Sequence, residues 1–338
     1  MTATQIDGRV IEIDDLTKRY GDLVAVDGIS FSVARGEVFG ILGPNGAGKT
    51  TTLEMVEGLR KPDGGSITVD GLPVWPNPKP VKRVIGVQLQ ATALFDYQRV
   101  WEIIYVFGST YGIHRSRQEC VTLLERVGIA DKADAFANQL SGGQAQRLSI
   151  ALALVNDPVV TFLDEPTTGL DPRARRALWD VIREINYGGT TVVLTSHYME
   201  EAERLCDRVA VMDRGHIMDI GPPQQLINKL GAEAVVTFTL SRRLPLAELR
   251  RLEGVNDCRA QEETGYELIA SDAQHVVVSL LDLARERDVK VENLDVKGAT
   301  LEDVFLQLTG HKLADDEAEV PEGSPGRKRR FGLGGGRR

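Results

Sequence analysis

The stretch of this chain with the clearest chemistry is GPNGAGKT, residues 43–50. Glycines let a backbone curl until several N–H groups point inward at phosphate oxygens, and a helix that begins there adds positive potential. Lys49 brings a full charge to the β- and γ-phosphates, and Thr50 offers a hydroxyl to Mg²⁺. The spacing predicts a site for a nucleoside triphosphate with Mg²⁺, made of Gly43, Pro44, Asn45, Gly46, Ala47, Gly48, Lys49, Thr50 and Thr51.

A second glycine-rich segment, LSGGQ at residues 140–144, comes just before a run with a helical pattern. The N-terminus of a helix attracts anions, so this segment is a second candidate phosphate site. A two-fold axis between two copies would place Ser141 and Gly143 of one copy over the γ-phosphate held by the other. Taken alone, the segment is equally an ordinary helix start with Ser141 as its cap. The contact residues expected from it are Ser141, Gly142, Gly143 and Gln144.

Two adjacent carboxylates, Asp164 and Glu165, follow the apolar run 159–163. Neighbouring strand residues face opposite ways, which permits two roles. Asp164 is expected to hold the Mg²⁺ shell, and Glu165 to polarise the attacking water. His197 closes another apolar run and could orient that water. Asp171 lies just beyond the carboxylates and either communicates between two copies or caps the helix that starts at Pro172.

The elements that must position these groups follow from the hydrophobic pattern. The apolar runs 38–42, 159–163 and 191–194 are separated by helical segments, which predicts parallel strands covered on both faces. The shorter runs 10–13, 23–26 and 66–69, with turn residues between them, predict an antiparallel layer. Residues 91–137 have a mostly helical pattern. This is an α/β architecture over residues 1–230.

A second, smaller unit is expected over residues 231–310. Candidate strands at 235–240, 267–270 and 289–296 surround a candidate helix at 272–288, a small α+β domain. On that helix one side is expected to carry Val276, Leu280, Leu281 and Leu283. The tail, residues 311–338, has five acidic residues, then a Pro/Gly/Ser stretch and six basic residues, and is expected to be disordered.

Composition excludes several classes of protein. The 338 residues carry a net charge of −9, which disfavours general binding of nucleic acid. With no apolar stretch of about 18 residues, no transmembrane helix is expected, and the acidic start shows no signal peptide. The three scattered cysteines fit neither a disulfide framework nor a zinc cluster. The pattern is that of an ordinary globular protein.

In their order, the motifs at residues 43–50, 140–144, 164–165, 171 and 197 resemble those of the ATP-binding cassette (ABC) ATPases. The resemblance covers residues 9–230. It implies a P-loop NTPase cassette with a RecA-like parallel core, an antiparallel β layer and a helical subdomain. Matched motif by motif, Lys49 and its loop correspond to Walker A, Asp164 to Walker B, and Glu165 to the catalytic glutamate. The remaining matches are Ser141 to Gln144 with the signature, Asp171 with the D-loop and His197 with the switch histidine.

Two further residues gain roles only through this resemblance. Tyr20 resembles the aromatic residue that stacks on adenine, and the alternative is an ordinary turn tyrosine. Gln90 resembles the Q-loop glutamine, which touches Mg²⁺ and relays the state of the nucleotide to a membrane partner. Because the sequence around it, IGVQLQ, holds two glutamines, Gln88 is the alternative.

Residues 88–95 and the segment GATLEDVFL at 298–306 are similar to the daunorubicin-resistance type of ATP-binding subunit. That branch implies ATP hydrolysis for a separate ABC-2-type permease that exports drugs, antibiotics or lipid-like compounds. The chain would act as a homodimer, peripherally bound at the cytoplasmic face of the cell membrane, with an accessory domain that helps hold the subunits together. The surface expected to dock on the permease carries Phe95, Trp101, Tyr105 and Phe107, unless these rings belong to the core.

Other functions remain open on sequence grounds. A non-transport ABC ATPase usually has two cassettes or a long coiled-coil insertion, and neither is present. A metabolic P-loop kinase or GTPase does not explain residues 140–144. An importer or a lipid-handling ATPase is separated from an exporter only by the two branch segments. The basic residues 327–330 either touch anionic lipid or only solubilise the tail.

Overall fold

The computed structural model of the protein describes residues 8–88, 97–229, 234–261, 264–270 and 272–310. Its centre is a six-stranded sheet in the order β10-β9-β3-β8-β7-β6. Five strands are parallel, and β10 runs antiparallel at one edge. The predicted parallel core is confirmed. The strands are β3 (Val38–Leu42), β6 (Ile85–Gln88), β7 (Val160–Asp164), β8 (Thr191–Ser196), β9 (Arg208–Asp213) and β10 (His216–Gly221).

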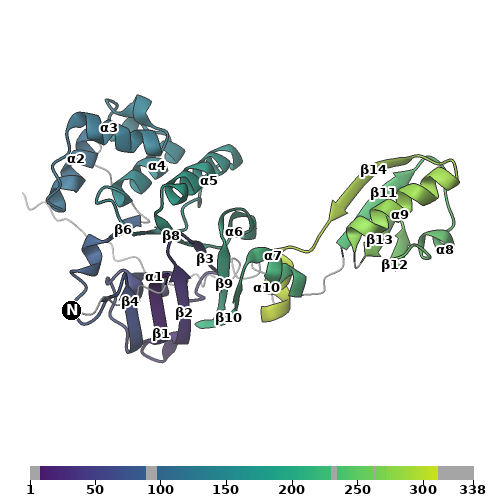
Figure 1. The fold of residues 1–338 in the computed structure, drawn as a ribbon, viewed down its shortest axis with the longest axis horizontal. Coiled ribbons are helices and arrows are strands. Elements are labelled where there is room, and N and C mark those ends of the chain that lie inside the picture. Colours follow the sequence, from purple (N-terminus) through teal and green to yellow (C-terminus); the bar gives the residue numbers. More distant parts are fainter. Residues whose placement is uncertain (1–7, 89–96, 230–233, 262–263, 271, 311–338) are drawn as a thin grey trace, which may run out of the picture.

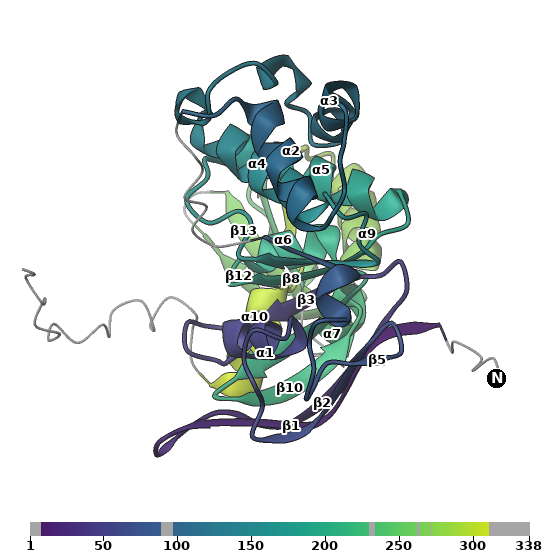
Figure 2. The same ribbon diagram turned by 90° about the vertical axis from the view of Figure 1, so that its left-hand side faces the viewer.

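An antiparallel sheet, in the order β2-β1-β4-β5, covers one face of this centre together with helix α1 (Figures 1 and 2). The predicted layer is confirmed, but β1 and β2 extend well beyond their apolar runs. The reason is that only alternate residues need to be buried where one face of a sheet meets solvent. The elements are β1 (Arg9–Tyr20), β2 (Leu23–Ala34), β4 (Gly64–Val69), β5 (Leu72–Pro73) and α1 (Lys49–Val56).

Helices cover the opposite face of the central sheet and share one apolar core with it. Gly86 in β6 allows α4 to approach closely, because a Cβ there would lie 1.8 Å from the carbonyl oxygen of Ala153. In the part of the chain that the structure describes, none of the helices combines the length and the apolar character needed to cross a bilayer. The layer contains α2 (Val100–Thr110), α3 (Arg117–Arg126), α4 (Gly142–Ala153), α5 (Pro172–Tyr187), α6 (Met199–Leu205) and, at its end, α7 (Pro223–Lys229).

The smaller α+β unit is a four-stranded antiparallel sheet in the order β12-β13-β11-β14, with α9 packed against it. Val276 and Leu280 of α9 are buried, as predicted, but Leu281 is 47% exposed and its assignment to the core side is wrong. Leu280 and Leu281 point about 100° apart on a helix, so Ala284, four residues after Leu280, takes the inner position. The elements are β11 (Ala234–Leu240), α8 (Leu246–Leu249), β12 (Val255–Ala260), β13 (Gly265–Ala270), α9 (Ala273–Glu286) and β14 (Val291–Lys297).

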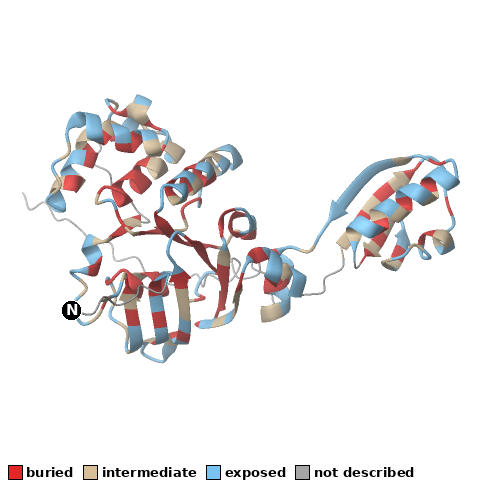
Figure 3. Ribbon diagram, viewed as in Figure 1, coloured by how far each residue is buried: buried red, intermediate tan, exposed pale blue. Residues whose placement is uncertain are grey.

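The last described helix, α10 (Leu301–Thr309), lies within the range 231–310 expected for the smaller unit, but its buried side chains are not part of that unit's core. It packs on α6 and α7, and its buried residues Leu301, Val304 and Phe305 belong to the same core as the helical layer (Figure 3). The backbone N–H of Leu301 also donates to Glu203 Oε1 at 2.7 Å. The apolar side of α10 is therefore buried against the cassette. The tail expected to be disordered lies outside the described residues.

Because Phe305 is fully buried in this contact, we expect Phe305→Ala to reduce the free energy of unfolding of the cassette by about 3–5 kcal/mol. Leu306→Ala, at a neighbouring position 36% exposed, should change it by no more than about 0.5 kcal/mol. The three tryptophans all lie in residues 1–230, so tryptophan fluorescence during urea unfolding reports on the cassette. Equal midpoints for the two variants would contradict the packing described here.

Candidate active site

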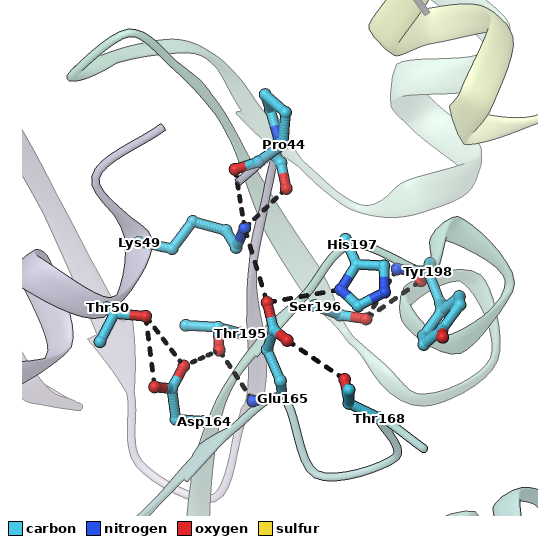
Figure 4. A network of polar contacts seen from close by, with 11 residues as sticks. Pro44, Lys49, Thr50, Asp164, Glu165, Thr168, Thr195, Ser196, His197 and Tyr198 are labelled. Carbon is cyan, nitrogen blue, oxygen red and sulfur yellow. Dashed lines mark hydrogen bonds and ion pairs between the residues drawn. The ribbon is translucent and has the colours of Figure 1, made fainter. Parts of the chain in front are cut away.

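The glycine loop connects the end of β3 to the start of α1 and closes around Lys49. Gly48 caps the helix with φ at 103°, and a Cβ there would lie 2.3 Å from the carbonyl oxygen of Ala25, so only glycine fits. The Lys49 ammonium donates to the carbonyl oxygens of Gly43 and Pro44 at 2.7 and 2.9 Å (Figure 4). Burial lowers the pKa of Lys49, and the nearby carboxylate of Glu165 opposes this shift. The loop thus holds a buried cation at the amino end of α1.

Asp164, at the carboxyl end of β7, faces the first turn of α1. The Thr50 hydroxyl lies 3.2 and 3.3 Å from the two oxygens of its carboxylate. The hydroxyl of Thr195, at the end of neighbouring β8, donates to Asp164 Oδ1 (Figure 4). Three adjacent chain segments therefore place oxygen atoms at one point of the sheet edge.

Glu165 occupies the centre of the site. Its Oε1 lies 3.9 Å from Lys49 Nζ and 3.4 Å from His197 Nδ1 (Figure 4). Its Oε2 accepts a hydrogen bond from the Thr168 hydroxyl at 3.1 Å. The contact with His197 lowers the pKa of Glu165 more than burial raises it. Glu165 is therefore a carboxylate at neutral pH, able to accept a proton from a bound water.

The backbone of Glu165 is in the left-handed region, with φ at 45°. This conformation is uncommon for a residue with a side chain. The N–H of Glu165 donates to the Thr195 hydroxyl at 3.0 Å, and the same hydroxyl donates to Asp164. One buried threonine thus fixes both carboxylate residues. Sequence reasoning gave no role to Thr195 or Thr168. The signal available was a hydroxyl residue two positions before His197 and another three after Glu165.

A pocket of about 320 Å³ brings the predicted aromatic residue and the glycine loop together. Arg60 and Lys18 lie over the Tyr20 ring, 5.3 and 5.6 Å from its centroid. Both cations are close enough to the ring for a cation–π contact. The pocket is lined by Tyr20, Leu23, Ala25, Asn45, Gly46, Gly48, Lys49, Thr50, Thr51 and Glu165.

The second glycine segment is not part of this pocket. Ser141 caps α4 and accepts a hydrogen bond from the Gln144 N–H, while Gln144 Oε1 accepts from the Ser141 N–H at 2.9 Å. Asp171 caps α5 by accepting from the N–H groups of Arg173 and Ala174, both at 2.9 Å. Their capping geometry is thus present, and their contact with nucleotide stays a prediction that needs a second copy.

Gln88 and Gln90 are the two candidates for the glutamine that contacts Mg²⁺. Gln90 lies outside the described residues, so its contact with Mg²⁺ stays a prediction. Gln88, the alternative, is the last residue of β6 and is buried, and its Oε1 has no hydrogen-bond partner among the described residues.

The donors at the sheet edge suit a magnesium ion. Thr50 and Asp164 supply oxygen ligands, the kind that Mg²⁺ prefers. In the described ranges there is no cluster of three or more His, Cys, Asp or Glu side chains able to hold a metal. Mg²⁺ usually keeps waters and substrate phosphates as its other ligands, so a two-residue site fits it and does not fit a structural zinc.

Comparisons with known proteins agree with this geometry. A family model described as "ABC transporter" matches residues 26–168. The linearmycin resistance ATP-binding protein of Bacillus subtilis is 37% identical over 311 residues, covering 90% of this chain and 100% of its own length. The daunorubicin resistance ATP-binding protein of Streptomyces coeruleorubidus is 35% identical, covering 93% of this chain and 99% of its own. A Nod factor export ATP-binding protein of Rhizobium meliloti is 41% identical, covering 90% and 89%.

Solved structures resemble the larger unit. A subunit of the cbiONQ ABC transporter complex of Clostridium perfringens is 29% identical, with a TM-score of 0.59, and covers 67% of this chain and 95% of its own. A bacterial ABC transporter cassette described as dimeric is 27% identical, with a TM-score of 0.56, and covers 63% and 98%. Both likenesses support the cassette fold.

We expect Thr195→Val to lower steady-state phosphate release about tenfold or more, because the buried N–H of Glu165 loses its acceptor and Asp164 loses a donor. Leaving such a group unpaired costs about 1–3 kcal/mol. Thr195→Ser keeps the hydroxyl and should retain most of the activity. The measurement is phosphate release against Mg²⁺ concentration, and equal rates for the Val and Ser variants would remove this role from Thr195.

Proposed function

Because the chain belongs to the ABC transporter family, we propose that it is the ATP-binding and ATP-hydrolysing subunit of an exporter that carries drugs, antibiotics or lipid-like compounds. The observation that carries this proposal is the meeting of Lys49, Asp164, Glu165 and His197 beside the pocket that Tyr20 and the loop line. The export assignment is supported by the relatives named for antibiotic resistance and for Nod factor export. We assign residues 1–230 to the cassette and residues 231–310, α10 apart, to an accessory domain.

In the proposed mechanism each residue acts on one part of the triphosphate. The loop amides and Lys49 hold the β- and γ-phosphates, and Tyr20 stacks on the base. Thr50, Asp164 and Gln90 would hold Mg²⁺, which when bound neutralises charge that develops between the β- and γ-phosphates. Glu165 accepts the proton of the attacking water, and His197, 3.4 Å from it, orients that water against the γ-phosphate.

A second copy of the chain is proposed to complete the site. Ser141 and Gly143 stand at the start of α4, outside the pocket of their own chain, with N–H groups suited to a phosphate. Two copies related by a two-fold axis would each lend this segment to the other, together with Asp171. None of the catalytic positions in the sequence is replaced, which favours two active sites in a homodimer. The accessory domain is proposed to help hold the two subunits together.

A separate ABC-2-type permease, with the chain peripherally bound at the cytoplasmic face of the cell membrane, is the second proposed partner. Of the predicted docking aromatics, Trp101 and Phe107 pack against the core of the helical layer, Tyr105 is exposed, and Phe95 lies outside the described residues. A better candidate surface is a cavity of about 200 Å³ between α2, α4, the end of α1 and β6. We call it the docking cavity. Its lining is Glu57, Leu59, Lys82, Ile85, Val87, Phe107, Tyr111, Ser149 and Leu152.

Glu165→Gln is expected to bind ATP but to release phosphate about 10²–10⁴ times more slowly, because the amide cannot accept the proton. With Mg-ATP the blocked variant should accumulate as a dimer in light scattering after gel filtration. Glu184→Gln, an exposed position on α5, is the matched control and should behave as wild type. Turnover near that of wild type would remove Glu165 as the base, and a strictly monomeric blocked variant would overturn the shared site.

For the docking cavity we expect Leu59→Arg to lower retention of the co-expressed permease about tenfold or more, by filling the cavity with its own side chain. Leu59 is half-exposed at the cavity, so the substitution should leave the fold and the basal ATPase activity unchanged. Tyr187→Arg, on an exposed apolar residue of α5 outside the cavity lining, is the control. Detergent co-purification measures retention. Equal retention for both variants would place docking elsewhere.

A further inference from the structure

The docking cavity contains a buried acid that the catalytic site does not use. Glu57 follows the last turn of α1, lines the cavity and is only 5% exposed. No hydrogen bond or ion pair from any described residue reaches its carboxylate, whereas neighbouring Glu54 is paired with Arg60. A buried carboxylate without a partner is costly, so its presence on a cavity wall needs an explanation.

A second unpartnered polar atom lies in the same wall. Ser149 of α4 is buried, and its hydroxyl oxygen has no hydrogen-bond partner within the described part of the chain. The walls around these two groups are mostly apolar, with Ile85, Val87 and Leu152 among them. The cavity therefore has two polar side chains without a hydrogen-bond partner among the described residues, set in mostly apolar walls.

The environment of Glu57 also favours an incoming positive charge. Burial, with the nearby charges of Asp164 and Glu54, raises the pKa of Glu57 to about 8, although Lys82 acts in the opposite direction. Glu57 is therefore largely protonated at neutral pH, and a cation beside it would favour its ionised form. Lys82 is exposed and makes no ion pair with Glu57 in the described structure. No described residue thus supplies a cation to Glu57, and a cationic donor from outside could pair with the carboxylate as it ionises.

The size of the cavity decides what kind of occupant fits. At about 200 Å³ it lies below the range of about 300–1,000 Å³ that drug-sized ligands occupy. A single long side chain inserted by a partner protein is a better match. Arginine has an aliphatic stem for the apolar walls and five N–H donors, enough for both the Glu57 carboxylate and the Ser149 hydroxyl.

We propose that the permease inserts a basic side chain, arginine by preference, into the docking cavity, where Glu57 and Ser149 bind it. This inference rests on the proposed function, because it assumes that a permease docks here. It also gives the contact a route to the nucleotide. Glu57 directly follows α1, whose first residues, Lys49 and Thr50, form the phosphate loop, so the helix joins the two sites over about 12 Å.

The test uses two small probes of nearly equal shape, butylguanidinium and the neutral butylurea, with the full-length chain. Ligand-observed NMR gives their dissociation constants, and methyl shifts of Val87 and Leu152 show whether they bind in the cavity. At pH 9, where Glu57 is ionised, wild type is expected to bind the guanidinium about tenfold more tightly than the urea, the effect of one charge-assisted hydrogen-bonded pair. Glu57→Gln should bind both probes equally, and Ser149→Ala should show a smaller loss.

Two variants serve as controls. Glu125→Gln, on an exposed acid of α3, should leave the preference for guanidinium unchanged. Lys82→Gln should leave it unchanged or increase it, and a loss of guanidinium binding in this variant would contradict the role given to Glu57.

Permease retention separates this inference from the proposed function. Retention that falls about tenfold in Glu57→Gln, with the probe preference lost, supports both. Equal binding of the two probes by wild type would overturn the inference, even if the permease is retained. If wild type prefers the guanidinium but retains no permease, the docking function fails while the cation site stands.

Discussion

The surrounding fold is built around one pair of opposite charges, Lys49 and Glu165, near the carboxyl ends of β3, β7 and β8. The Lys49 ammonium and the Glu165 carboxylate are both largely buried and lie 3.9 Å apart. Neither charge is tolerable alone at such a place, because the desolvation of an unpaired ion is costly. The parallel sheet solves this by ending neighbouring strands at one edge, so that residues far apart in the chain neutralise one another.

That arrangement leaves the site poised for a polyanion. Lys49 is turned to the loop carbonyls of Gly43 and Pro44 and to Glu165, and each of these contacts is with an acceptor that phosphate oxygens can replace. The hydroxyl of Thr195 makes two hydrogen bonds, one that restrains Asp164 and one that restrains the left-handed backbone of Glu165. Strain at a reacting residue persists only where its surroundings fix it, as they do here.

Helix α1 connects the phosphate loop to a different part of the molecule. Its amino end carries Lys49 and Thr50, and Glu57 follows its carboxyl end, between the central sheet and the helical layer. In the same way α10 ties the segment after β14 to α6, the helix that begins two residues after His197.

Local sequence determined the loop at residues 43–50, the Asp164–Glu165 pair and the parallel strands that carry them, because each depends on spacing and on apolar runs within a few residues. Only tertiary structure decided the roles of Thr195 and Glu57 and the burial of Phe305. In the sequence Thr195 is only one residue of a strand, and its contact with Asp164 and Glu165 exists because β8 pairs with β7. The sequence suggests that Glu57 is a solvated acid, but in the fold α2, α4 and β6 enclose it. The sequence also suggests that α10 belongs to the smaller unit, but in the fold it packs on α6 and α7. Apolar runs predict which strands are buried, but the burial of a polar or isolated residue depends on distant segments brought together in the fold.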